Sequence, residues 1–168
     1  DTHASLELLT THHKPHFRLF TTTNATSAAS ALCSRMAAQL MVAYPQLRPE
    51  TIRALIVHSA EWTDAMRQMY PPTTKNNRVN LIRHCGWGVP DLERARWSAA
   101  NSLTLIVEDT LHPYRKDGST IKTRDMHLHE LPWPTEELEA LGHILVQMRV
   151  TLSYFIEPNP SARGTVSK

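Results

Sequence analysis

Three features that mark particular classes of protein are missing from this chain of 168 residues. Its two cysteines, Cys33 and Cys85, provide neither a disulfide framework nor a zinc-binding motif. No run of about 18 apolar residues is present, so we expect no membrane span. The formal net charge is only +2 and the arginines are scattered, so we expect no nucleic-acid partner. The cysteine usage fits a reducing compartment, so we expect a cytoplasmic protein.

The residues that are present indicate a folded chain with a strong helical segment. Apolar residues make up 41% of the sequence, which is enough for a packed core. Apolar side chains recur at helical spacing between Ser27 and Ala43, and alanines separate them, so we expect a buried helix there with Cys33 as a core thiol. Pro45 ends this segment. Pro49 then suits the first position of a second helix, which we expect to run to His58.

Four short segments, in this order and spacing, resemble the subtilisin-like serine peptidases (subtilases). Residues 25–29 (ATSAA) match the core of the family's nucleophile motif, Gly-Thr-Ser-Met-Ala-x-Pro. Residues 44–47 (YPQL) match the turn after the central helix, and residues 52–56 (IRALI) match the next helix. Residues 86–91 (GWGVPD) resemble the Gly-x-Gly segment that closes the catalytic domain. The chain departs from the family where Ala25 replaces the glycine of the nucleophile motif.

The resemblance implies that Ser27 is a catalytic nucleophile. Its hydroxyl would project from the amino end of an interior helix into an open groove, and its backbone N–H would help to bind the oxyanion. The family's catalytic Asp and His precede the serine by long stretches, whereas only 26 residues precede Ser27 here. We therefore expect both to lie outside this chain, in the N-terminal part of a parent peptidase that cleaves peptide or protein substrates. We expect no cofactor and no bound metal.

The predicted fold class is α/β, in two parts. Residues 1–108 would form the C-terminal portion of a subtilisin-like catalytic domain, and residues 109–168 would form a β-rich extension. Expected strands lie at 17–20, followed by an active-site loop at 21–24, and at 102–107 and 143–156. A hairpin turn is predicted at 116–119 (KDGS), and a polar loop with prolines at 70–80.

Several histidines suggest other sites, each with a simpler interpretation. His127 and His129 would share a face on a strand and could bind a metal with Asp125, Glu130 or His112 as a third ligand, although a solvated strand face is the favoured interpretation. His58 ends the second helix, where a partly positive imidazole suits the helix dipole. The remaining candidates form a histidine-rich tract that we interpret as a mobile terminus rather than a source of a base: His3, His12, His13 and His16.

Two functions other than peptide hydrolysis stay open. The chain could be a non-catalytic interaction module derived from a subtilase, or a zinc-binding β-domain. Residues 127–159 also resemble the tail of a bacterial subtilase subgroup, some members of which are encoded beside an AAA-type ATPase. That resemblance implies such an ATPase as a partner.

Overall fold

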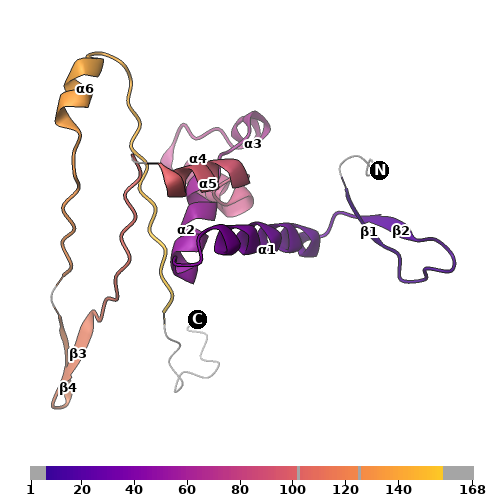
Figure 1. Ribbon diagram of the computed structural model, residues 1–168, viewed down its shortest axis with the longest axis horizontal. Helices are drawn as coiled ribbons and strands as arrows, with labels where there is room; N and C mark the ends of the chain where they lie inside the picture. The colour runs from indigo at the N-terminus through magenta and orange to yellow at the C-terminus, as the bar shows by residue number, and fades with distance from the viewer. Residues whose placement is uncertain (1–6, 102, 125, 157–168) are drawn as a thin grey trace. The chain divides into compact units, whose positions relative to one another are not determined.

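The structure is a computed structural model that describes residues 7–101, 103–124 and 126–156 (Figure 1). The chain divides into two compact units, residues 1–47 and residues 48–168. Among the described residues, the first unit contains one helix and the second contains five, and each unit has one two-stranded antiparallel sheet, so the predicted α/β class is confirmed in the coarse sense of mixed helices and strands. The functional boundary after residue 108 stays a prediction.

The first unit begins with a β-hairpin. Strand β1 (Leu8–Thr11) pairs antiparallel with strand β2 (Phe20–Thr23), so that Leu8 lies opposite Thr23 and Thr11 opposite Phe20. The hairpin orders a segment that we expected to be a mobile terminus. The strand begins at Phe20, so residues 17–19 are not in it as predicted, and residues 21–23 lie in the strand rather than in a loop; only residues 24 and 25 remain between β2 and the following helix.

Helix α1 (Thr26–Ala43) begins one residue before its predicted start and ends where predicted. Leu40 is its buried residue, whereas Cys33, Leu32 and Met41 are exposed. The prediction of a buried helix with Cys33 as a core thiol is therefore wrong. The physical reason is that apolar spacing gives a helix a face to bury but does not supply a partner for that face. Among the described residues of this unit, the other element is the β1–β2 hairpin, whose strands pair with each other.

Four helices open the second unit: α2 (Pro49–Ser59), α3 (Asp64–Met69), α4 (Lys75–Cys85) and α5 (Leu92–Ala100). Helix α2 has Pro49 in its first turn, as predicted. The polar loop predicted at 70–80 is wrong in its second half, because α4 starts there. The Thr74 hydroxyl accepts a hydrogen bond from Asn77 N at 3.2 Å and so caps α4 immediately after the prolines.

The core of the second unit lies where α2 packs against α5. Small residues on α5 let the two helices approach closely, and the branched side chains of α2 fill the interface. The buried residues of this unit are Thr51, Ile52, Leu55, Ser59, Ala60, Leu81, Ala95 and Ser98.

The segment at 86–91 forms the predicted turn and leads into α5. Glu61 and Val89 form an antiparallel bridge, with Glu61 N donating to Val89 O at 3.1 Å and Val89 N donating to Glu61 O at 2.8 Å. Gly88 directly precedes Val89 and follows the end of α4, and it has a φ of +100°. Asp91 then caps α5 by accepting a hydrogen bond from Arg94 N at 2.6 Å. This turn therefore fixes the end of α2 against the start of α5.

The remainder of the second unit has little regular structure. Strands β3 (Tyr114–Asp117) and β4 (Thr120–Thr123) form a hairpin around the predicted turn, and α6 (Thr135–Leu141) follows. Residues 103–107 and 143–156 form no strand, and residue 102 lies outside the described residues. The β-rich extension is thus not confirmed. A strand needs a neighbour for its backbone groups, and residues 151–154 bond to side chains of α2 instead.

Arginine side chains hold these extended segments. Arg53 Nε donates to Ser153 Oγ at 2.8 Å, and the same guanidinium bonds to Tyr154 O. Arg149 Nη1 donates to His58 O at 2.6 Å. In the described part of the chain, no helix combines the length and apolar character needed to cross a bilayer.

Candidate functional site

Ser27 is the second residue of α1 and is exposed. The residue before the helix, Ala25, is extended, with φ −71° and ψ 156°, and the chain turns into the helix at Thr26. A hydroxyl at this position stands beside the amino end of the helix, where free N–H groups and the helix dipole favour negative charge. The structure thus makes the Ser27 hydroxyl accessible, and its role as a nucleophile stays a prediction.

The amino end of α1 has no side-chain cap. Ala25 has no polar side-chain atom, and no side chain caps the helix among the described residues. The Ala28 N–H donates to Ala25 O at 2.9 Å. The N–H group of Ser27 therefore lacks the capping oxygen that Ser, Thr, Asp or Asn would provide, and the N–H group of Thr26, as the first of the helix, has no acceptor within the helix. Such unpaired donors are what an oxyanion site requires.

The described residues provide no base for Ser27. None of them forms a hydrogen bond with its hydroxyl. His12, His13 and His16 lie in the connection between β1 and β2, and His3 lies outside the described residues. His12 Nδ1 accepts a hydrogen bond from Lys14 N at 3.1 Å, and its ring lies 4.3 Å from that of His13. His12 and His13 therefore contact each other, and His12 also contacts the backbone of the connection.

His58 has a structural role at the end of α2. Its Nδ1 lies 2.9 Å from Thr151 Oγ1, and its carbonyl accepts the hydrogen bond from Arg149. Burial lowers the pKa of His58, and the positive charge of Arg149 lowers it further. Burial and Arg149 thus favour the neutral ring, whereas the position of His58 in the last turn of α2 favours the charged one.

The two histidines of the His-x-His pair do meet a third group, and it is Asp109. His127 Nδ1 lies 2.6 Å from Asp109 Oδ2, and His129 Nε2 lies 4.0 Å from the same oxygen. The pKa of Asp109 is lowered, chiefly by the hydrogen bond from Thr110 N at 2.6 Å and then by His127. Of the third ligands that we considered, His112 and Glu130 do not belong to this cluster, and Asp125 lies outside the described residues.

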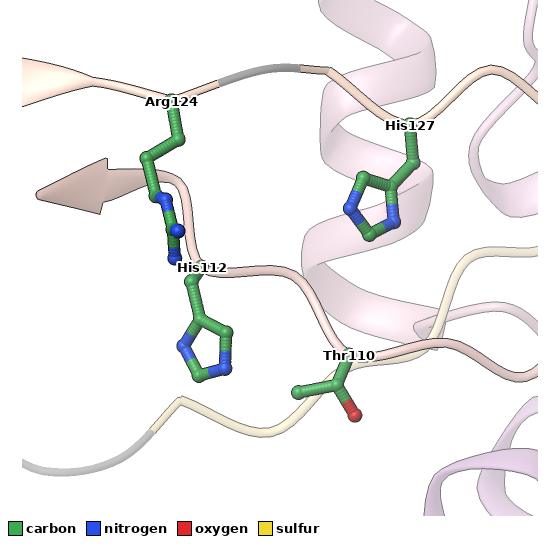
Figure 2. Close-up of a pocket in the computed structure, with 4 residues that line it drawn as sticks. All are labelled: Thr110, His112, Arg124 and His127. Carbon is green, nitrogen blue, oxygen red and sulfur yellow. The ribbon is translucent and has the colours of Figure 1, made fainter.

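A shallow pocket of about 220 Å³ adjoins this cluster. Thr110 and His112 line it from the segment before β3, and Arg124 and His127 line it from the segment after β4 (Figure 2). Figure 2 shows the Arg124 guanidinium directed toward the His112 ring, with His127 on the same arm as Arg124. The pocket therefore combines a cation, imidazoles and a hydroxyl.

We did not identify Asp109 from the sequence as a partner of the two histidines, although the hairpin pattern indicates it. Tyr114 pairs with Thr123 and Asp117 with Thr120, so the same register continued outward sets Asp109 opposite Leu128, between His127 and His129. In a hairpin, residues equidistant from the turn face each other. A search for carboxylates mirrored across that turn would have found Asp109. Arg53 and Arg149, which hold the C-terminal segment, carry no comparable signal, because their partners are backbone and hydroxyl groups nearly 100 residues away.

Comparison with known proteins adds two findings. The subtilase family matches residues 1–88 of this chain. A protein of Sinorhizobium fredii, described as "Uncharacterized protein y4bN", is 31% identical over 167 residues, which cover 96% of this chain and 33% of the relative. The chain thus spans about a third of that relative's length. No solved structure matches the chain significantly.

Proposed function

The chain belongs to the subtilase family, and we propose that it carries Ser27 as the nucleophile of a serine endopeptidase. The Ser27 oxygen attacks the carbonyl carbon of the scissile peptide bond while a histidine takes the hydroxyl proton. The same histidine returns that proton to the departing amine, which leaves an acyl-enzyme. Water then releases the acid and restores the serine.

One observation carries this proposal: an exposed serine stands at the uncapped amino end of an 18-residue helix, within the segment that matches the family. An uncapped end costs about 1 kcal/mol compared with one capped by Ser, Thr, Asp or Asn. Leaving the N–H groups of residues 26 and 27 free is thus mildly unfavourable for the helix. It becomes useful when those groups bind the negative oxygen of a tetrahedral intermediate.

The catalytic base and its orienting carboxylate lie outside this chain in our proposal. No described residue forms a hydrogen bond with the Ser27 hydroxyl, and the chain spans a third of its Sinorhizobium relative. The N-terminal part of the parent peptidase would supply both groups, and a peptide or protein chain would be the substrate. A cytoplasmic location and an AAA-type ATPase partner belong to the same proposal. The cysteine usage supports the location, and the bacterial subgroup resemblance alone supports the ATPase.

Peptide hydrolysis by the full-length protein tests the proposal, with Ser27→Ala compared against Ser30→Ala. Ser30 is also exposed and lies one turn further along α1, where its hydroxyl donates to Thr26 O at 3.1 Å. We expect Ser27→Ala to lower kcat by about 10⁶-fold, a magnitude taken from subtilisin, itself a member of this family. Ser30→Ala should retain nearly full activity. Equal activity of the two variants would refute the assignment of Ser27.

The interaction-module alternative rests on the absence of a described base near Ser27. It predicts that the full-length protein hydrolyses no peptide and that Ser27→Ala changes neither stability nor partner binding. Activity that depends on Ser27 would exclude it.

A further inference from the structure

Asp109, His127 and His129 bring one carboxylate and two imidazoles together at the base of the β3–β4 hairpin. One ligand atom from each residue lies within 4.8 Å of the other two. The two imidazole rings lie 6.4 Å apart and meet edge-on at 75°, so they do not stack on one another. All three side chains are exposed, so an ion can reach them from solvent.

The donor set matches that of a divalent transition metal. Zn²⁺ binds imidazole nitrogen and carboxylate oxygen at about 2.0–2.2 Å in tetrahedral geometry. Ligand atoms around such an ion are about 3.3 Å apart, from those bond lengths. The observed separations of 2.6 Å and 4.0 Å lie on either side of this value. Rotation of exposed side chains is therefore enough to seat the ion, and a fourth position stays open to water.

The hairpin itself shows why an ion here would matter. Every residue from 109 to 124 is exposed, so the hairpin has no core of its own. Two-stranded hairpins without a packed face are marginally stable. An ion that joins Asp109 to His127 closes a loop across 18 positions of sequence and supplies binding free energy to the folded form.

We propose that Asp109, His127 and His129 bind one Zn²⁺ ion, which joins the two arms of the β3–β4 hairpin. This site replaces our expectation that the chain binds no metal. It is independent of peptide hydrolysis, because none of its three residues has a part in the proposed chemistry of Ser27. Its role is structural: the ion holds the segment before β3 against the segment after β4.

Calorimetric titration of the 168-residue chain, without a histidine tag, with ZnCl₂ tests the site. The histidine-rich tract near β1 is a competing zinc binder, so the titration uses a background in which His12, His13 and His16 are alanine. We expect one equivalent of zinc to bind in that background. Asp109→Asn, His127→Ala or His129→Ala should each weaken zinc binding at least tenfold. Changing a residue that only hydrogen-bonds to a metal ligand already lowers metal affinity by about 10-fold or more, and these three residues are the ligands themselves. All three changes affect exposed side chains, so the core stays intact.

His112→Ala is the matched control, because His112 lines the adjoining pocket but is not one of the three ligands. It should bind zinc as the unchanged chain does. Amide hydrogen exchange gives a second readout: zinc should slow exchange in residues 114–123 of the unchanged chain but not of His129→Ala. The proposal is overturned if the background chain binds less than half an equivalent, if His129→Ala retains full affinity, or if His112→Ala abolishes binding.

Discussion

Replacing Gly88 by alanine should break the junction between α2 and α5. A Cβ atom built on Gly88 would lie 2.2 Å from Glu61 O and 2.7 Å from Trp62 N, whereas ordinary contacts begin at 3.4 Å. Both obstacles are backbone atoms, so no side-chain rotation relieves the clash. The Glu61–Val89 bridge must open for the alanine to fit.

The expected loss has two parts. An alanine held at a φ near +100° costs about 1–3 kcal/mol. Opening the bridge removes two backbone hydrogen bonds, of 3.1 Å and 2.8 Å, each with a net value of about 1 kcal/mol. Gly88→Ala should therefore reduce the free energy of unfolding by about 3–5 kcal/mol, a large share of the 5–15 kcal/mol typical of a domain.

Gly86→Ala is the control, because Gly86 also has a positive φ, of +55°, but a Cβ there meets nothing within 4 Å. It should cost only the backbone part, about 1–3 kcal/mol. Urea unfolding followed by tryptophan fluorescence reports on this region directly, since the Trp62 and Trp87 rings lie 6.4 Å apart. The two variants should differ by about 2 kcal/mol, or roughly 1 M in urea midpoint. Equal midpoints would refute the close approach of Gly88 to Glu61.

Three further outcomes are expected. Burial lowers the pKa of His58 below 6.5, so the unfolded chain binds a proton more readily than the folded chain. The free energy of unfolding should therefore be highest above about pH 7 and should fall as the pH drops through 6.5 toward the folded-state pKa. In a pH series of unfolding curves, His58→Gln should remove that dependence. The hydrogen bonds from Thr51 and Arg48 lower the pKa of Glu108 below 4.5. The contribution of Glu108 to the free energy of unfolding should therefore be present above about pH 5 and be lost as the pH falls through the folded-state pKa. A Glu108→Gln variant that kept the same acid sensitivity would contradict this. Asp91→Ala removes the cap of α5 and should cost about 0.5–2 kcal/mol in urea unfolding, whereas Asp91→Asn should cost less, because its side-chain oxygen can still accept from Arg94 N.

Local patterns predicted the parts of the fold that depend on local forces. Helices α1 and α2 followed from apolar spacing and from Pro49 at a helix start, and the β3–β4 hairpin followed from the turn residues at 116–119. Helix α4 was missed because the prolines before it and the polar residues before and within it are typical of a loop. Its start depends on one residue, Thr74, which caps it. A capping search after each proline would have located it.

The predicted strands failed for a different reason. Alternation in residues 143–156 shows only that the segment can be extended, since a strand also needs a partner elsewhere in the chain. Here the partners of the segment are side chains: Arg53 bonds to Ser153, and His58 bonds to Thr151. No pattern within the segment predicts these contacts. The exposure of α1 is similar: its apolar spacing predicts burial, but what buries a helix lies beyond its own sequence.

The candidate site was only partly readable from sequence. The position of Ser27 followed from its motif and the helix that starts there, and the structure adds that the side chain is exposed and the helix end uncapped. The histidine pair was noticed, but its third member depends on how the hairpin brings Asp109 across to His127. Distances between segments, rather than residue types, were the missing information.

Mapping a covalent label tests the central claim most directly. The full-length protein is treated with a fluorophosphonate, which phosphonylates activated serines, and is then digested with trypsin. Cleavage after Arg18 and Arg35 gives the peptide 19–35, which carries Ser27, Ser30 and Ser34 as internal alternatives. Our account predicts one phosphonyl group on this peptide, located by fragmentation on Ser27 and absent from Ser27→Ala. Label on Ser30 or Ser34, or label that survives Ser27→Ala, would contradict it.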